Sequence, residues 1–285
     1  MWPDIGLCLG TVRQASLVQL IEVAGRHGFP SITASPEMID QALSGGAKTA
    51  ELKQRMADRG LRISYLDALT RDVPGAAAVE NVPELWRRNW IYSLDDLLHM
   101  AEVLGVPTIN VTHFMGTPVP VAVMAEGIAA LAARAARHGR ALALEFMPET
   151  GLPDAATAAE VVQLAGAANV GLMLDTWHLL RGGGTVADIQ ALPPWSLRGV
   201  QLNDRLADAS QPSDTGYTVS ERSLPGEGDA PLGELVRAIV HNTPTVPIEV
   251  EVFNSTLACV APENAAARVA AALKSWRANL PPLGI

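Results

Sequence analysis

The sequence predicts one (β/α)8 TIM barrel, an α/β fold, that spans residues 1–285 as a single domain. Short runs of aliphatic and β-branched residues alternate with longer stretches that have the spacing of amphipathic helices. Eight such units can be counted, and 285 residues suit eight strand–helix units. The alternative, a doubly wound dinucleotide-binding sheet, lacks the G-x-G-x-x-G turn that should follow its first strand.

The expected strands are runs rich in Val, Ile, Leu and Thr, and several of the expected helices end at a glycine. The strands are predicted at residues 5–12, 31–35, 62–69, 108–114, 141–147, 170–174, 197–202 and 248–253. The helices are predicted at residues 16–27, 47–59, 93–104, 119–138, 154–167, 186–191, 232–241 and 263–276. Residues 70–89 and 205–230 exceed an ordinary connection, so we expect them to be loops over one end of the barrel.

Composition excludes several classes of partner. Twenty-one Lys and Arg against 30 Asp and Glu give a net charge of −9, which opposes binding to nucleic acid. No apolar run approaches the about 20 residues that cross a bilayer, and the N-terminus lacks a basic leader, so we expect no membrane partner and a cytoplasmic location. The two cysteines, Cys8 and Cys259, lie near opposite ends in apolar surroundings and form neither a disulfide framework nor a thiolate zinc site.

Four polar residues follow the apolar runs of the last four predicted strands: Glu145, Asp175, Gln201 and Glu251. The carboxyl ends of barrel strands meet at one mouth, where catalysis takes place. Three carboxylates there would repel one another and would be costly to bury, and a divalent cation removes both problems. Three carboxylates and one amide oxygen form a hard ligand set suited to Mn²⁺, Mg²⁺ or Co²⁺. The sequence therefore predicts a divalent-metal site.

Two alternatives stay open at this point. A single acid at a strand end is often a helix cap or an ion-pair partner, and only the series of four favours a metal. Glu249 alternates in phase with Glu251, so both could face the barrel interior. We choose Glu251 because it lies nearer the end of the strand.

These residues occur in longer motifs: LEF at 144–146, LDTWH at 174–178, VQLND at 200–204, RSLPGEG at 222–228 and EVEVF at 249–253. The motifs resemble the sugar phosphate isomerase/epimerase superfamily of xylose-isomerase-like barrels. The resemblance covers nearly the whole chain and is strong from the fifth strand onward. It implies a metal, Mn²⁺ or Mg²⁺ ahead of Co²⁺ or Zn²⁺, on the residues that match Glu145, Asp175, Gln201 and Glu251. The family commonly has His at the position of Gln201, which leaves the metal preference open.

The resemblance also implies roles in catalysis. In the epimerases of the family, the glutamates that match Glu145 and Glu251 flank the substrate and exchange its proton, and the histidine that matches His178 holds a substrate oxygen. An alternative for His178 is packing beneath the glycine-rich turn that follows it.

Three further residues are expected to bind substrate. Arg222 would anchor a phosphate or carboxylate, because a guanidinium forms two parallel hydrogen bonds to such groups; the alternative is a solvated loop charge. His113 would face the mouth from the fourth strand, or lie in the core. Trp177 would form part of the wall of the pocket, or pack beneath the loops.

The sequence predicts a metal-dependent isomerase or epimerase of a polyhydroxy ketone or sugar-like small molecule, which acts by removing a proton α to a carbonyl. The alternative is a dehydratase of a cyclic keto-polyol or keto acid, such as an inosose or dehydroshikimate. A non-catalytic barrel should lack one of the glutamates, and none is missing. The apurinic-site endonucleases of the superfamily need several more histidines and a basic groove, whereas this chain has six His in all. Whether the chain forms a homo-oligomer is left open.

Overall fold

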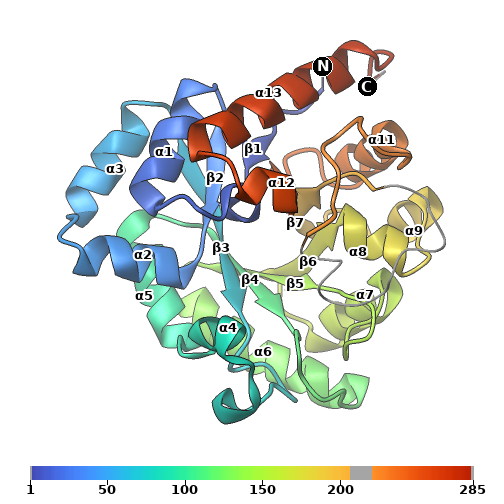
Figure 1. Cartoon of the computed structure of the whole chain (residues 1–285). Coiled ribbons are helices and arrows are strands. Elements are labelled where there is room, and N and C mark those ends of the chain that lie inside the picture. The colour runs from blue at the N-terminus through green and yellow to red at the C-terminus, as the bar shows by residue number, and fades with distance from the viewer. Residues whose placement is uncertain (1, 206–219, 284–285) are drawn as a thin grey trace.

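Eight parallel strands close into a barrel in chain order, and helices cover its outside (Figure 1). The computed structural model describes residues 2–205 and 220–283. The strands are β1 (Gly6–Leu7), β2 (Ser31–Ala34), β3 (Arg62–Leu69), β4 (Thr108–Thr112), β5 (Ala141–Glu145), β6 (Val170–Asp175), β7 (Leu197–Leu202) and β8 (Ile248–Val250). The predicted (β/α)8 barrel is confirmed, and β3 and β7 have the bounds that the sequence predicts.

The helices begin and end at residues that stabilise helix termini. Ser16 and Ser93 form capping boxes, and Gly105 and Gly166 end their helices in the left-handed conformation that glycine adopts readily. The α-helices are α1 (Leu17–Arg26), α2 (Pro36–Ser44), α3 (Thr49–Ala57), α4 (Glu84–Arg87), α5 (Leu94–Leu104), α6 (Val121–Arg137), α7 (Ala155–Ala165), α8 (Thr176–Arg181), α9 (Val186–Ala191), α11 (Leu232–Asn242), α12 (Ser255–Ala258) and α13 (Pro262–Ala278). Short 3-10 helices are η1 (Leu9–Val12), η2 (Val79–Asn81) and η3 (Arg88–Trp90).

The structure differs from the sequence prediction mainly at the barrel mouth. The first strand ends at Leu7 because Cys8 caps η1, so residues 9–12 form a helical turn and not an extension of the strand. Helices α2 and α8 were not predicted, although Ser35 followed by Pro36 is a typical helix start. The predicted loop 70–89 contains η2 and α4. Of the predicted loop 205–230, residues 206–219 lie outside the described residues.

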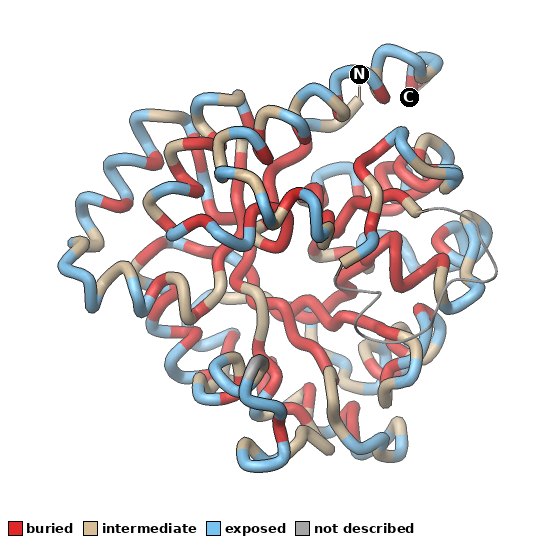
Figure 2. The backbone as a smooth tube through the Cα atoms, viewed as in Figure 1, coloured by how far each residue is buried: buried red, intermediate tan, exposed pale blue. Residues whose placement is uncertain are grey.

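The core has two parts. A large apolar cluster fills the space between strands and helices, and the buried residues in Figure 2 concentrate there. Inside the barrel, Tyr65, Ala143 and Met173 form a separate small cluster. A Cβ on Gly199 would lie 2.5 Å from Met173 Cε, so glycine leaves room for the methionine to fill the barrel. This cluster closes the barrel below its carboxyl end. No helix in the described residues is long and apolar enough to span a membrane.

Candidate active site

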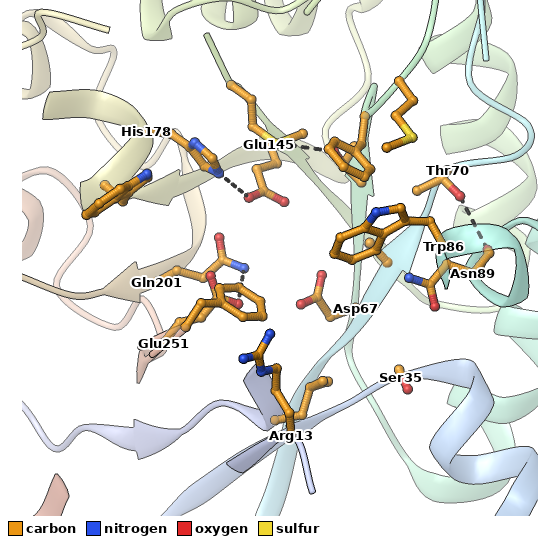
Figure 3. Close-up of a pocket in the computed structure, with 18 of the residues that line it drawn as sticks. Arg13, Ser35, Asp67, Thr70, Trp86, Asn89, Glu145, His178, Gln201 and Glu251 are labelled. Carbon is orange, nitrogen blue, oxygen red and sulfur yellow. Dashed lines mark hydrogen bonds and ion pairs between the residues drawn. The ribbon is translucent and has the colours of Figure 1, made fainter. Parts of the chain in front are cut away.

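A cavity of about 680 Å³ opens at the carboxyl ends of the strands. Its wall includes acids, an amide, a histidine and arginines together with aromatic rings. The polar side chains in this wall include Arg13, Asp67, Glu145, His178, Gln201, Arg222 and Glu251, and the aromatic ones include Trp86, Trp90, Phe114, Trp177 and Phe253. Figure 3 shows the acids, Gln201 and His178 pointing toward a common centre, with Trp86 on the other side.

Strand register brings the predicted ligands together. Glu145 and Asp175 are the last residues of β5 and β6, and the β6–β7 pairing sets Asp175 beside Gln201. Glu251 directly follows β8 and is 2% exposed, yet it lines the cavity. Each of these side chains is buried, so their charges interact through protein and not through bulk water.

Glu249 lies one layer lower, and it is not among the residues that line the cavity. It is fully buried, and the Ser31 hydroxyl donates a hydrogen bond of 2.7 Å to its Oε1. Burial raises the pKa of Glu249 to about 7, although hydrogen bonds from Ser64 and Ser31 oppose the shift. The structure therefore brings Glu251, and not Glu249, to the cavity.

Neutral donors hold one oxygen of each carboxylate on the β6 and β5 side. Asp175 Oδ1 accepts from Asn203 Nδ2 and from the backbone N–H of Trp177, both at 2.7 Å. Glu145 Oε2 accepts from Asn110 Nδ2 at 2.6 Å. These bonds fix the carboxylates and leave Asp175 Oδ2 and Glu145 Oε1 on the side of His178, whose Nε2 lies 3.5 Å and 3.7 Å from them.

The same arrangement occurs at Glu251. Its Oε1 accepts from Gln201 Nε2 at 3.0 Å and from the Cys8 thiol at 3.1 Å. Gln201 Oε1 is buried and has no hydrogen-bond partner in the described part of the chain. A buried, unpaired amide oxygen is costly unless something absent from these contacts, such as a cation, binds it.

The donor set fits a divalent cation. Ligand atoms of Glu145, Asp175 and His178 lie within 4.8 Å of one another, and so do those of Cys8, Asp67 and Glu251. With the free oxygen of Gln201, the site offers carboxylate and amide oxygens, which hard cations such as Mg²⁺ and Mn²⁺ prefer.

Burial and charge shift the acids in different directions. Burial raises the pKa of Glu145 well above its usual range, and the charges of Asp67, Glu251 and Asp175 raise it further. Burial also raises the pKa of Glu251 to about 8, against the opposing effect of Arg222. For Asp175, burial is the largest single influence and by itself would raise the pKa. The charge of Arg222 and the groups that donate hydrogen bonds to Asp175 together outweigh burial, so the pKa of Asp175 is lowered.

His178 is neutral at pH 7, because burial lowers its pKa to about 4 against the opposing charge of Asp175. A neutral imidazole can accept a proton or hold a substrate oxygen, depending on which nitrogen carries its hydrogen.

Arg222 is held from both sides of the mouth. Its backbone N–H donates to Phe253 O at 3.0 Å, and its side chain is 2% exposed, with the guanidinium over the rings of Phe253 and Trp177 at 4.7 Å and 5.6 Å. Its Nη1 donates to Asp175 Oδ2 and Glu251 Oε2, each at 2.8 Å. It is therefore a buried cation and not a solvated loop charge.

His113 is not brought to the cavity. It is 1% exposed, its Nδ1 accepts from the backbone N–H of Gly151 at 3.0 Å, and a Cβ on Gly116 would lie 2.5 Å from its Nε2. The ring is packed among glycine-containing loops beside the mouth, which is the core alternative. Trp177 does line the cavity, as the sequence predicts.

Sequence reasoning missed three residues of the site. Asp67 lies within β3 and Asn110 within β4, and Asn110 Nδ2 donates to Asp67 Oδ1 at 2.8 Å as well as to Glu145. The expectation that Cys8 lies in apolar surroundings is wrong, because its thiol contacts Glu251. A polar residue inside an apolar strand was the available indication for Asp67 and Asn110.

The chain matches the family described as xylose isomerase-like TIM barrel over residues 21–277. No curated protein matches it. Among solved structures, the IOLI protein with a bound zinc atom has a TM-score of 0.81 and 18% identity, with 98% of this chain and 100% of that chain covered.

Two other solved structures are similar in fold. The probable 3-DHS dehydratase AsbF of Bacillus anthracis has a TM-score of 0.73 and 16% identity, with 95% of this chain and 99% of that chain covered. The D-psicose 3-epimerase of Clostridium cellulolyticum H10, solved with D-tagatose, has a TM-score of 0.71 and 17% identity, with 97% and 99% covered. Since the family match covers nearly all of the barrel, the chain belongs to the xylose isomerase-like TIM barrel family.

Proposed function

We propose that this chain is a divalent-metal-dependent isomerase or epimerase of a polyhydroxy ketone or sugar-like small molecule. The observation that carries the proposal is the pair Glu145 and Glu251. The two carboxylates come from β5 and from the end of β8, line one cavity, and are each restrained at one oxygen by neutral donors. Two restrained bases on different sides of one cavity suit the removal and return of a proton.

The residues proposed to hold the metal are Glu145, Asp175, Gln201 and Glu251. When bound there, a divalent cation would polarise the carbonyl of the substrate and stabilise the negative charge that develops on its oxygen. Oxygen ligands favour Mn²⁺ or Mg²⁺, and the zinc atom in the IOLI structure makes Zn²⁺ the competitor to test.

The proton steps belong to the glutamates. One carboxylate takes the proton from the carbon next to the carbonyl, and a carboxylic acid returns a proton to the same carbon or to its neighbour. Neutral His178 would hold a substrate oxygen during this exchange, as the family resemblance implies. The buried floor of Tyr65, Ala143 and Met173 excludes water from below.

A dehydratase is the second candidate, and Asp67 favours it. Its carboxyl group also lines the cavity, and burial raises its pKa, against a hydrogen bond from Asn110. A carboxylic acid beside the β-hydroxyl would donate the proton that allows water to leave, whereas its absence would leave reprotonation as the outcome. A cyclic substrate would suit the aromatic wall.

A cytoplasmic location remains a prediction.

To test the proposal, the protein is incubated in D₂O with Mn²⁺ and with polyhydroxy ketones, inososes or dehydroshikimate. The Mn²⁺ is removed before the products are examined by NMR. Deuterium at the α-carbon without loss of oxygen supports the isomerase or epimerase. Loss of water with a new conjugated absorbance supports the dehydratase. If Glu145→Gln and Glu251→Gln exchange a confirmed substrate as fast as the wild type does, the assigned proton-transfer roles are wrong.

A further inference from the structure

Arg222 binds one oxygen of each of two proposed metal ligands, Asp175 and Glu251. Asp175 Oδ1 and Glu251 Oε1 are each held by neutral donors. Their remaining oxygens, Asp175 Oδ2 and Glu251 Oε2, are bound by one atom, Nη1 of Arg222, at 2.8 Å each. The guanidinium therefore bridges two of the four proposed ligands through the oxygens that those donors do not use.

The structure holds this guanidinium in place. The segment that carries Arg222 forms antiparallel bridges on both sides, Asp204 with Ser223 and Glu221 with Asn254. The Asn254 side-chain amide donates to the carbonyl of Arg222 at 3.0 Å. With its charged end between two aromatic rings, the arginine needs little further ordering to meet the carboxylates.

The charge balance explains why a cation is needed there. Glu145, Asp175 and Glu251 are all buried, and Nη1 of Arg222 lies 2.8 Å from an oxygen of Asp175 and 2.8 Å from an oxygen of Glu251. Buried carboxylates without a counter-charge are strongly destabilising.

We infer that Arg222 is an internal counter-cation of the metal-free protein, and that a divalent cation must displace its guanidinium from Asp175 Oδ2 and Glu251 Oε2 in order to bind. The inference rests on the proposed metal site and adds to it a competitor supplied by the chain itself. It gives Arg222 a role that differs from anchoring an anionic group of the substrate. The competitor stabilises the metal-free fold and weakens the affinity of the site for metal.

The first experiment measures metal binding and needs no substrate. Arg222→Met removes the charge and keeps a flexible apolar stem between the two rings. After EDTA treatment and removal of the chelator, calorimetric titration with Mg²⁺ and Mn²⁺ should show affinity at least about tenfold tighter than in the wild type. The metal-free variant should also melt at a lower temperature, and added metal should raise its Tm more than it raises that of the wild type.

Arg13→Ala is the matched control. The guanidinium of Arg13 also lies over the ring of Phe253, at 5.7 Å, but this arginine is exposed. Its removal changes the charge of the mouth by the same amount. We expect its effect on metal affinity to stay within about threefold, because exposed charges are screened.

A second measurement covers the case in which Arg222→Met does not fold. In protein with ¹⁵N-labelled arginine, the guanidinium signals of Arg222, identified by their loss in Arg222→Lys, should move when Mg²⁺ is added to the wild type. In Arg222→Ala, free guanidinium ion at low millimolar concentration should raise the Tm of the metal-free protein and weaken Mg²⁺ binding. In the wild type the same addition should do neither.

The outcomes separate this inference from the proposed function. Metal affinity that is equal or weaker in Arg222→Met, with wild-type binding intact, would mean that Arg222 orients the ligands and does not compete, which overturns the inference alone. Unmoved Arg222 signals on saturation with Mg²⁺ would overturn it as well. If neither the wild type nor Arg222→Met binds any divalent cation, the metal site of the proposed function fails, and the displacement fails with it.

Discussion

The two halves of the barrel contribute differently to the cavity. The end of strand β5, strand β7 and the residue after β8 supply Glu145, Gln201 and Glu251, which line the cavity, and β6 supplies Asp175, which is fully buried beside Gln201. These four are the proposed metal ligands, and the two glutamates are the proposed bases. Strands β1 to β4 supply the groups that hold two of these acids: the thiol of Cys8, which follows β1, and Asn110 on β4. The comparison indicates that the proposed ligands and bases come from one half, and that the other half adds contacts that position two of them.

The largest expected effect distinguishes Glu251 from Glu249, which lie two residues apart at the carboxyl end of β8. Glu251→Gln should lower α-proton exchange on a confirmed substrate by about 10³-fold, because it removes a base, and it should weaken metal binding. Glu249→Gln is the control, since this neighbour lies outside the cavity and Gln keeps its size. NMR exchange rates and calorimetry measure both effects. Equal losses in the two variants would contradict the assignment of the chemistry to the mouth layer.

The second prediction concerns stability. Glu249 has a pKa of about 7 in the fold against an ordinary 4.5, so the folded protein keeps a proton that the unfolded chain releases between these values. The free energy of unfolding should therefore fall as pH rises from about 4.5 to about 7, by about 3 kcal/mol from this group. Below and above that window its contribution should be constant.

Glu249→Gln cannot titrate and should lack this part of the slope. Urea unfolding of both proteins in EDTA, across the same pH range, measures the difference. Parallel stability curves for the wild type and the variant would show that Glu249 has the same pKa in the folded and the unfolded protein.

The third prediction concerns the half that positions the acids. Asn110→Ala removes the amide that donates to both Glu145 and Asp67, and we expect kcat to fall about 10- to 100-fold with a smaller change in KM. Thr112→Val is the control, because Thr112 lines the cavity on the same strand and its hydroxyl contacts only a sulfur among the described residues, Met147 at 3.9 Å. A similar loss in the control would mean that β4 acts through packing.

The difference between the halves also explains what could be predicted from the sequence. On the fifth and sixth strands, the apolar run ends on a single acid, so the period of the pattern and the rule of strand ends are sufficient to place Glu145 and Asp175 at strand ends. In the first half, Asn110 and Asp67 lie within their strands, where periodicity does not distinguish a site residue from a buried polar one.

The wrong expectations for Cys8 and His113 have a similar physical cause. Cys8 reads as an apolar core residue, and its contact with Glu251 depends on the closure of β1 onto β8, which joins residues 243 positions apart. His113 lies at a strand end, as a site residue should, but packing around it decides that it contacts Gly151 and not the cavity. Long-range closure and loop packing are not encoded in local patterns.

The smallest expected effect tests the weakest of the positioning contacts, the one from Cys8. The sulfur accepts from Thr33 Oγ1 at 3.2 Å and from the backbone N–H of Gly10 at 3.4 Å, so its single hydrogen is left for Glu251 Oε1. Cys8→Ala removes that donor and should lower kcat about three- to tenfold, since Gln201 still holds the same oxygen. Cys8→Ser retains a hydroxyl donor and should restore most of the activity. Steady-state kinetics of the two variants, with Cys259→Ser as the control for loss of the exposed thiol, measures the effect. If serine is no better than alanine, Cys8 fills space beneath Glu251, and the first half of the barrel positions its acids through Asn110 without a contribution from the thiol.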